Sequence, residues 1–297
     1  MQKALFPGYT VGPDAYEDIV NICSAYGKKA AIIGGRKALA AAEPQIRKAV
    51  EGSGIEITGT FWYGGEASRE NMDMLRPQVA DADMIFAVGG GKAIDTCKVL
   101  AHAIGVPSAI VGTAPSMDGY ASNSSSMEVN HVKVSLYNHA PVGILLDSEI
   151  LAQAPMRMLW AGLGDMVAKY IAVCEWRISH IVTGEFYCES IAQMMRSALK
   201  KIVDASDGIT KRDPDAIQSI AEGLVVAGMA MAYAEISRPA SGLEHYFSHM
   251  WEMMALERGV PYDLHGIQVG VGTVLSMKLY RKIRQIQPDR AKAEALM

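Results

Sequence analysis

Two histidines four residues apart are the side chains whose types and spacing most directly indicate chemistry in this sequence. His245 and His249 follow residues 237–242, a segment typical of the start of a helix. Residues four apart lie on one helix face, so both imidazoles would point the same way. Such a pair can share a metal ion, or one ring can bind a metal while the other handles a proton. A packing contact between two helix residues is the other interpretation.

A carboxylate and a third imidazole extend this pair to a complete ligand set. Asp165 follows Gly162-Leu163-Gly164 at the start of an apolar helix, and His265 lies in the segment Leu264-His265-Gly266. Together with His245 they form a set of two histidines and one carboxylate. Such a set suits a divalent transition metal, because three protein ligands leave coordination positions open for a substrate oxygen.

A glycine turn in the other half of the chain indicates a second site. The apolar residues 83–88 have the length of a strand, and Gly89-Gly90-Gly91-Lys92 follows them at the expected start of a helix. Glycines let backbone N–H groups approach a pyrophosphate closely, and the helix directs its positive dipole end to the same place. The turn is neither G-x-G-x-x-G nor a P-loop, so a tight turn without a ligand remains the alternative.

A small and polar run at residues 113–126 follows another expected strand. A loop of this kind can wrap a ligand, and its hydroxyls together with Asp118 could hydrogen-bond a nicotinamide and a polyol. A solvated surface loop is the competing interpretation.

The pattern along the chain predicts two domains. Residues 1–150 are expected to form a nucleotide-binding α/β domain with a mostly parallel, Rossmann-like sheet, and residues 151–297 an all-α domain that binds metal and substrate. A ligand would lie between them, at the carboxyl ends of the strands. Strands are predicted at 29–34, 55–61, 84–88 and 108–112; helices at 38–50, 69–80 and 92–103; and breaks between later helices at 206–208, 213–215, 237–242 and 259–261.

Composition excludes some partners. The chain has 297 residues, of which 50% are hydrophobic and 20% charged, and its net charge is -4. That charge provides no basic surface for nucleic acid. The first residues lack the apolar core of a signal peptide, and no uninterrupted apolar run has membrane-spanning length, so we expect a cytoplasmic protein without a membrane span.

Five segments, in order, resemble the sn-glycerol-1-phosphate dehydrogenases, a branch of the iron-containing alcohol dehydrogenase and glycerol dehydrogenase superfamily. Glycerol dehydrogenases share the glycine turn and the metal set, whereas Ser116-Met117-Asp118-Gly119 and Arg238-Pro239-Ala240-Ser241-Gly242 resemble the glycerol-phosphate branch. The segments are residues 89–95, 113–119, 162–165, 237–245 and 265–266.

The resemblance implies a metal-dependent reduction of dihydroxyacetone phosphate to sn-glycerol 1-phosphate, and the reverse oxidation, a step of phospholipid biosynthesis. NADH or NADPH would be the cofactor, together with one divalent metal, Zn²⁺, Ni²⁺ or Fe²⁺. The partner would be a small phosphorylated three-carbon substrate, and the enzyme would be a homo-oligomer. Alternatives are a glycerol dehydrogenase-like enzyme acting on an unphosphorylated polyol, a lyase-type relative such as dehydroquinate synthase, and a catalytically impaired member of the fold.

The resemblance also implies a role for each matched residue. Asp165, His245 and His265 would bind the metal, and Asp118, Asp165 and His249 would bind the substrate. His249 and Asp118 would be catalytic, with His249, whose ordinary pKa is about 6.5, supplying the proton that follows hydride transfer. The cofactor would contact Gly89, Gly90, Gly91, Lys92, Asp95, Thr113, Ser116 and Ser122.

Three departures from the family pattern accompany the resemblance. The family's His-Gly-Glu is here His265-Gly266-Ile267, so a charge or hydrogen bond from that glutamate would be missing. The chain stops at Met297, earlier than family members usually do, which would remove terminal helices. The first predicted strand leads to Arg36 and offers no acidic residue for a ribose hydroxyl; Arg36 would either favour a 2′-phosphate or face solvent.

Overall fold

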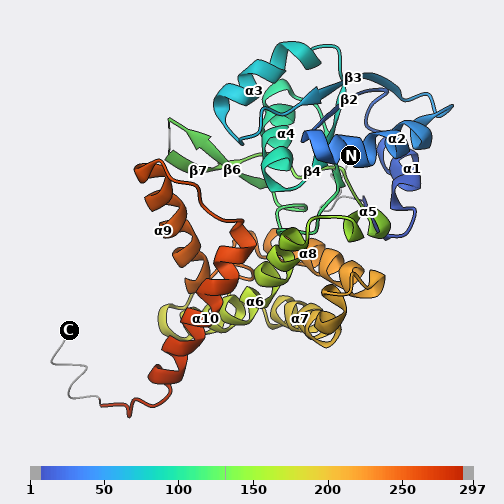
Figure 1. Ribbon diagram of the computed structural model, residues 1–297. Coiled ribbons are helices and arrows are strands. Elements are labelled where there is room, and N and C mark those ends of the chain that lie inside the picture. Colours follow the sequence, from blue (N-terminus) through green and yellow to red (C-terminus); the bar gives the residue numbers. More distant parts are fainter. Residues whose placement is uncertain (1–7, 131, 290–297) are drawn as a thin grey trace.

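Parallel strands form the sheet of the N-terminal half. The computed structural model describes residues 8–130 and 132–289, with the sheet and its helices at the top of Figure 1 and the remaining helices below. The sheet has six strands in the order β1-β8-β5-β4-β2-β3, and every neighbouring pair is parallel. The strands are β1 (Gly8–Gly12), β2 (Lys29–Gly34), β3 (Glu56–Trp62), β4 (Met84–Gly89), β5 (Ser108–Gly112) and β8 (Gly143–Asp147).

Helices cover both faces of this sheet because its strands are apolar on both sides. Ile32 and Phe86 pack with α1 (Ile19–Cys23) and α2 (Arg36–Val50). Ile33 and Ile85, which alternate with them, pack with α3 (Arg69–Leu75) and α4 (Gly91–Ile104). Two 3-10 turns, Ala15–Asp18 and Arg76–Val79, complete the connections. The predicted α/β architecture is confirmed, although the short strand β1, flanked by glycines, was not predicted.

The carboxyl ends of three central strands meet at one edge of the sheet. Gly34 of β2 lies beside Val88, and Gly89 of β4 lies beside Gly112 of β5. The chain leaves β2 toward β3 on one side and then returns to β4 on the other, so the strand order reverses between β2 and β4. Open α/β sheets bind ligands at such a point.

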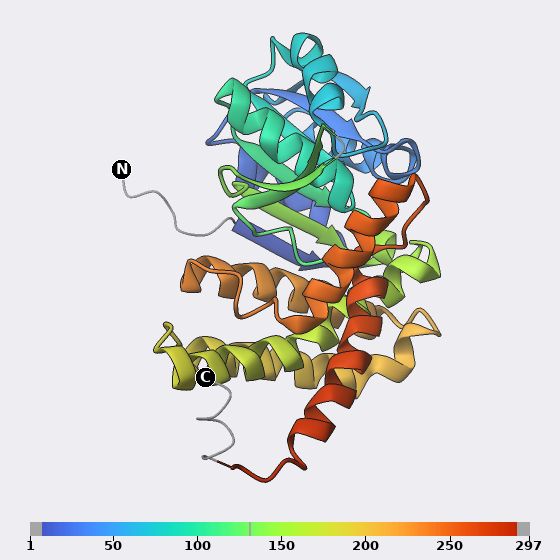
Figure 2. The same ribbon diagram turned by 90° about the vertical axis from the view of Figure 1, so that its left-hand side faces the viewer.

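Helices alone follow β8 among the described residues, as predicted for the C-terminal half. They are α5 (Ser148–Ala152), α6 (Met156–Thr183), α7 (Glu189–Ile209), α8 (Pro214–Ala234), α9 (Leu243–Arg258) and α10 (His265–Ile283). In Figure 2, α10, in red, crosses the layer of α6, α7 and α8 at a steep angle. The breaks predicted at 213–215, 237–242 and 259–261 are confirmed, but the one at 206–208 is wrong, because α7 continues through these residues to Ile209.

One apolar cluster continues from the sheet into these helices. Ile110 and Leu146 of the sheet belong to the same buried cluster as Leu159 of α6 and Leu224 of α8. By length and composition alone, α8 is apolar enough to cross a membrane, but 61% of its most apolar stretch is buried inside the molecule. We assign it as a core helix. The exact division into domains at residue 150 stays a prediction.

A two-stranded hairpin stands apart from the main sheet. Its strands, β6 (Ser124–Val129) and β7 (Val132–Tyr137), are antiparallel, and β7 contacts α9 (Figure 1). The predicted polar loop therefore ends at Asn123, and the last three residues of the run at 113–126 belong to β6. Serine is a weak strand former, so the hairpin depends on tertiary contacts, chiefly the fully buried Lys98. Its Nζ donates to the carbonyls of Gly119, Ser122 and Ser124 at 3.0, 3.2 and 2.7 Å.

Candidate metal and cofactor site

Asp165, His245 and His265 meet where α6, α9 and α10 converge. One ligand atom from each lies within 4.8 Å of the other two. Asp165 is fully buried, His245 is 6% exposed, and the side chain of His265 is 32% exposed. Asp165 Oδ1 lies 3.7 Å from His245 Nε2. The three predicted ligands are thus together, with one side open through His265.

Carboxylates orient both imidazoles. Glu244 Oε1 lies 2.8 Å from His245 Nδ1. Glu252 Oε1 lies 3.6 Å from His265 Nδ1, and Ser248 Oγ lies 3.2 Å from the same nitrogen. An acceptor at Nδ1 fixes the proton there and leaves the Nε2 lone pair for a metal. The donor set and its supporting carboxylates therefore fit a divalent transition metal.

The protein shifts the pKa values of Asp165 and His245 toward the forms that bind a metal, whereas it shifts that of His265 toward the protonated ring, which a metal would have to deprotonate. Burial lowers the pKa of His245, although its hydrogen bond to Glu244 opposes the shift, so the ring is neutral as a metal ligand must be. Burial alone would raise the pKa of Asp165, but the charges of Lys169, His265 and His245 together lower it. Burial opposes protonation of His265, yet its contact with Glu252 and the charge of Asp165 raise its pKa.

The missing glutamate of the family motif does not leave His265 without support. Ile267 follows Gly266 on α10 and contributes no polar group. Glu252 and Ser248 on α9 occupy the Nδ1 side of His265 instead. The hydrogen bond expected from a glutamate at position 267 is therefore missing, but the ring of His265 is still oriented by Glu252 and Ser248.

Glycines beside the ligands let α6 and α10 touch backbone to backbone. A Cβ at Gly164 would lie 2.2 Å from the Gly266 carbonyl oxygen, and one at Gly266 would lie 1.9 Å from the Ala161 carbonyl oxygen. Gly162 is equally tight against Pro115, where a Cβ would lie 1.9 Å from the carbonyl oxygen. These residues precede Asp165 or follow His265, so the motif glycines bring the two ligands together.

A buried lysine links the metal ligand to the predicted substrate residue. Lys169 lies one turn after Asp165, and its Nζ is 2.9 Å from Asp165 Oδ1 and 2.6 Å from Asp118 Oδ2. The Asp118 backbone N–H donates to Asp165 Oδ2 at 2.9 Å. Burial opposes the charge on Lys169, but Asp118 and Asp165 outweigh it and raise its pKa. Asp118 is therefore held beside the metal ligands by charge as well as by its loop.

His249 faces the cluster from the next turn of α9. Its ring centre lies 6.2 Å from that of His245 and 5.9 Å from that of His265. Burial, and then the neighbouring imidazoles of His265 and His245, lower the pKa of His249 to about 4. The ring is therefore neutral near pH 7, and it would pass a proton on from solvent, whereas the sequence had indicated an imidazole near its ordinary pKa.

One cavity connects these side chains to the glycine turn. It has a volume of about 940 Å³ and lies between the carboxyl ends of the strands and α9 and α10. His245, His249, His265 and Asp118 line it, while Asp165 and Lys169 lie behind its wall. Every predicted cofactor residue lines the same cavity: Gly89, Gly90, Gly91, Lys92, Asp95, Thr113, Ser116 and Ser122.

The glycine turn leaves space at its centre. Gly89 has φ +137°, which side chains disfavour, whereas Gly90 has φ -110° and is the N-cap of α4. A Cβ at Gly90 would meet nothing nearer than Ser116 Oγ at 3.4 Å. Neither backbone conformation nor packing requires glycine at position 90. The open position fits the close approach of a pyrophosphate to the first N–H groups of α4.

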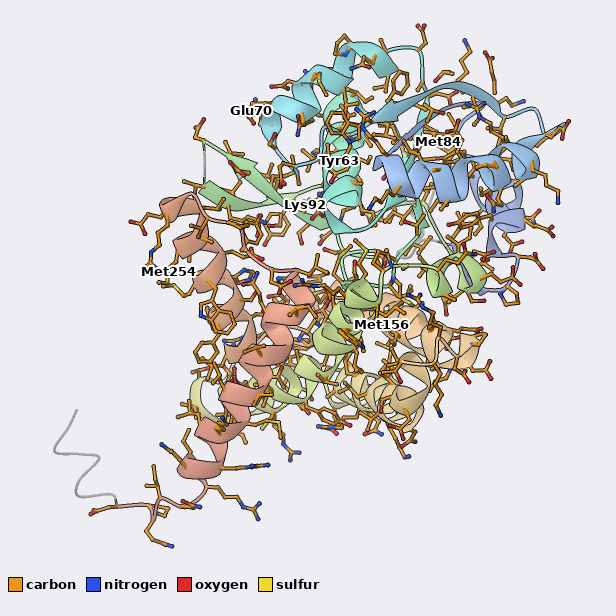
Figure 3. All side chains as sticks on the ribbon, viewed as in Figure 1. Tyr63, Glu70, Met84, Lys92, Met156 and Met254 are labelled. Atoms are coloured by element: carbon orange, nitrogen blue, oxygen red, sulfur yellow. The ribbon has the colours of Figure 1, made fainter. Side chains whose placement is uncertain are left out.

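Two of the predicted cofactor residues have partners inside the protein. Lys92 Nζ lies 2.5 Å from Glu66 Oε2. Figure 3 labels Lys92 at the end of α4 that faces the helical half and Met156 at the start of α6 across the boundary. Burial raises the pKa of Asp95, which lies 3.6 Å from Lys98 Nζ. Asp95 thus helps to fix the start of the hairpin, and its predicted contact with the cofactor stays a prediction.

Sequence reasoning missed four charged residues of the site. Lys169 could have been recognised from the sequence, because it lies one turn after Asp165 in an otherwise apolar stretch of the helix. Glu244 directly precedes His245, and Glu252 lies two turns further along the same face of α9. Lys133 had no local signal, since its partners Glu252 and Tyr262 are distant in sequence.

Comparison with known proteins shows which family this chain resembles. Residues 10–155 match the family described as iron-containing alcohol dehydrogenase. The chain is 37% identical over 203 residues to a glycerol-1-phosphate dehydrogenase [NAD(P)+] of Bacillus licheniformis, a match that covers 68% of this chain and 51% of that protein. It is 32% identical over 269 residues to one of Hyperthermus butylicus, which covers 90% of this chain and 75% of that protein.

The chain thus spans about half the length of the Bacillus relative that it matches. Among solved structures, the fold is similar to that of a probable glycerol dehydrogenase from Sinorhizobium meliloti, with a TM-score of 0.76 and 21% identity. The match covers 98% of this chain and 79% of that one. At this identity the likeness concerns the fold alone.

Proposed function

Because the chain belongs to the glycerol-1-phosphate dehydrogenase family, among the iron-containing alcohol dehydrogenases, we propose that it interconverts dihydroxyacetone phosphate and sn-glycerol 1-phosphate with NAD(P)H and a divalent metal. The observation that carries this proposal is the single cavity that joins the glycine turn to the Asp165, His245 and His265 cluster. A hydride donor on one wall and a polarised carbonyl on the other require such a cavity.

The reaction would need three contributions from this chain. The first N–H groups of α4, at Gly91 and Lys92, would bind the pyrophosphate of the cofactor and so fix the position of its nicotinamide. When bound, NAD(P)H would supply the hydride for the carbonyl carbon, and the carbonyl electron pair would move to oxygen. Asp165, His245 and His265 would hold the metal, which when bound supplies positive charge beside that oxygen.

The remaining contribution is to supply a proton to the new oxygen and to orient the substrate. A proton must reach the new oxygen to give the alcohol, and His249, whose ring centre lies 5.9 Å from that of His265, would supply it. A neutral imidazole can donate one N–H and regain a proton from solvent at the other nitrogen. Asp118, fixed by Lys169, can accept a hydrogen bond from a substrate hydroxyl with its other oxygen.

The test is an assay with separate substrates. NADH or NADPH absorbance would be followed with dihydroxyacetone phosphate, dihydroxyacetone and, in the reverse direction with NAD⁺ or NADP⁺, glycerol, each with added Zn²⁺, Ni²⁺ or Fe²⁺. We expect metal-dependent oxidation of the reduced cofactor that is fastest with the phosphorylated ketone. Turnover of dihydroxyacetone alone would point to a polyol dehydrogenase, and turnover of neither ketone would overturn the proposal. A cytoplasmic location and a homo-oligomeric state stay predictions.

A further inference from the structure

Four lysine and arginine side chains line the cavity, and two of them, Lys92 and Lys133, lie against the ring of Tyr262. Arg36 and Lys37 begin α2 and Lys92 begins α4, so these three lie at the strand ends where the cofactor is expected. Lys133 comes from β7 of the hairpin, which contacts α9. Lys133 differs from Lys92 in its contact with Glu252, the carboxylate that also faces His265.

The ammonium of Lys133 is held in place by long contacts. Its Nζ lies 3.5 Å from Glu252 Oε2 and 3.4 Å from the Tyr262 hydroxyl, and 5.2 Å from the centre of the Tyr262 ring. Lys169, by comparison, has carboxylate oxygens at 2.6 and 2.9 Å. An ammonium has three N–H donors. Lys133 is therefore oriented by its neighbours, yet its donors are not saturated by short hydrogen bonds.

Glu252 ties this ammonium to the metal ligands. One oxygen of its carboxylate faces His265 Nδ1 at 3.6 Å and the other faces Lys133 Nζ at 3.5 Å. A single carboxylate thus separates the third metal ligand from the cation. In dihydroxyacetone phosphate, one carbon and one ester oxygen separate the carbonyl carbon from phosphorus. A phosphate site therefore has to lie close to the metal ligands, and the Glu252 contacts put Lys133 on that side of the cavity.

The hairpin adds hydroxyl donors on the same face. Ser126 and Ser135 are directly paired across β6 and β7, and Lys133 precedes Ser135 by two residues on β7. All three side chains therefore lie on one face of the hairpin. All three line the cavity. Ser125 and Met127, which alternate with Ser126, are buried on the other face.

We propose that Lys133, together with the hydroxyls of Ser126 and Ser135, binds the phosphate group of the substrate and so selects a phosphorylated ketone over a free polyol. This inference rests on the proposed function. A phosphate is recognised by a compact ammonium charge and by hydroxyl donors, and an ionic hydrogen bond is stronger than a neutral one. Tyr262 and Glu252 hold the ammonium at a fixed distance from the carbonyl end of the substrate.

The experiment compares the wild type with Lys133→Met, Lys133→Arg and the control Lys200→Met, all loaded with Zn²⁺. Lys200 is a highly exposed lysine on α7, away from the cavity. For each protein kcat/KM is measured with dihydroxyacetone phosphate and with dihydroxyacetone. We expect Lys133→Met to lower the value for the phosphorylated ketone about 10- to 100-fold more than the value for the free ketone. Lys133→Arg should recover part of the loss, and Lys200→Met should match the wild type.

A binding measurement keeps the inference separate from the proposed function. Glycerol 1-phosphate, glycerol and inorganic phosphate are titrated calorimetrically into the Zn²⁺- and NAD⁺-loaded proteins, whose folding is checked by circular dichroism. We expect the wild type to bind glycerol 1-phosphate and inorganic phosphate. The Lys133→Met variant should bind neither of them. A wild type that reduces dihydroxyacetone phosphate, together with a Lys133→Met variant that keeps the same preference and affinity, would overturn only the phosphate assignment. A wild type that neither turns over nor binds the phosphorylated compounds would overturn both proposals.

Discussion

The two ends of the cavity are lined by different kinds of chemical group. The cofactor end is rich in backbone groups and small side chains, such as Gly90 and Ser116 from two neighbouring strand ends, and its cations, Arg36, Lys37 and Lys92, lie at the starts of helices. The metal end consists of charged side chains from α6, α9, α10 and the loop before β6, including the fully buried Asp165, Lys169 and Glu244. The first end offers dipoles to a large ligand, whereas the second concentrates charge around a small one.

This difference predicts how each end responds to change. Buried charges depend on one another, because removal of one partner leaves the other without compensation in a medium of low polarity. Dipoles from a helix N-terminus act together, and each contributes a small part. Substitutions at the metal end should therefore have large effects that spread to several properties. Substitutions at the cofactor end should have smaller effects confined to one ligand.

The largest effect is expected from His245→Ala. Loss of one of three protein ligands should remove bound metal and activity together and leave the fold intact. Metal content by mass spectrometry, with turnover of dihydroxyacetone phosphate, measures both. The matched control is His102→Ala, an exposed histidine at the end of α4. A His245→Ala protein with full stoichiometric metal would show that the ligand set is wrong.

His249→Ala should separate catalysis from metal binding. If His249 moves the proton while His245 binds metal, the variant keeps metal and cofactor but loses roughly two to four orders of magnitude in turnover. Deuterated NADH isolates the chemical step. Loss of metal from this variant, or turnover close to that of the wild type, would make Asp118 or water the better proton source.

Lys169→Met tests the coupling of charges at the metal end. Removal of the shared cation leaves Asp118 and Asp165 side by side, which should cost about 3–5 kcal/mol of the free energy of unfolding. Added Zn²⁺ should restore part of the loss, because it neutralises the same carboxylates. Denaturant unfolding with and without Zn²⁺ measures this.

The control for Lys169→Met is Lys200→Met. Lys200 pairs with Asp204 at the same helical spacing but on the surface, so its loss should cost much less stability than the loss of Lys169. Equal losses in the two variants would mean that the charges of the metal end are no more interdependent than those of the surface.

The smallest effect is expected from Gly90→Val. A branched side chain would enter the space above the N-terminus of α4 and weaken NADH and NADPH binding by about 10- to 100-fold, while metal content stays unchanged. Fluorescence titration measures the affinity, and Gly90→Ala should give an intermediate value. Unchanged affinity for both cofactors would leave the turn as a connection without a ligand.

The contrast between the two ends also explains what the sequence could predict. The glycine turn was predictable because its strand, turn and helix are contiguous, and four of the six strands had clear apolar runs. The ligands Asp165, His245 and His265 were identified because each lies in a short motif. The same motifs contain Gly162, Gly164 and Gly266. The sequence does not show that these glycines permit close backbone packing around α6, because the segments that they contact are distant in sequence.

The supporting residues could not be predicted in the same way. Lys133 and Tyr262 are 129 residues apart and meet only because the hairpin reaches α9. The hairpin itself was missed because Ser124, Ser125 and Ser126 have the composition of a loop. Their strand conformation is imposed by Lys98 and Asp95 from α4, which local propensity does not describe.

The contacts of Lys98 restrict the motion of the hairpin relative to α4. A two-stranded hairpin is marginally stable by itself, and here a single buried ammonium joins three carbonyls at its base to α4. If the hairpin moved away from α4, the three carbonyls and the ammonium would lose their hydrogen bonds to one another at the same time. The hairpin and α4 should therefore fluctuate as one cooperative unit, so that the wall carrying Lys133 stays in register with the helix that receives the cofactor.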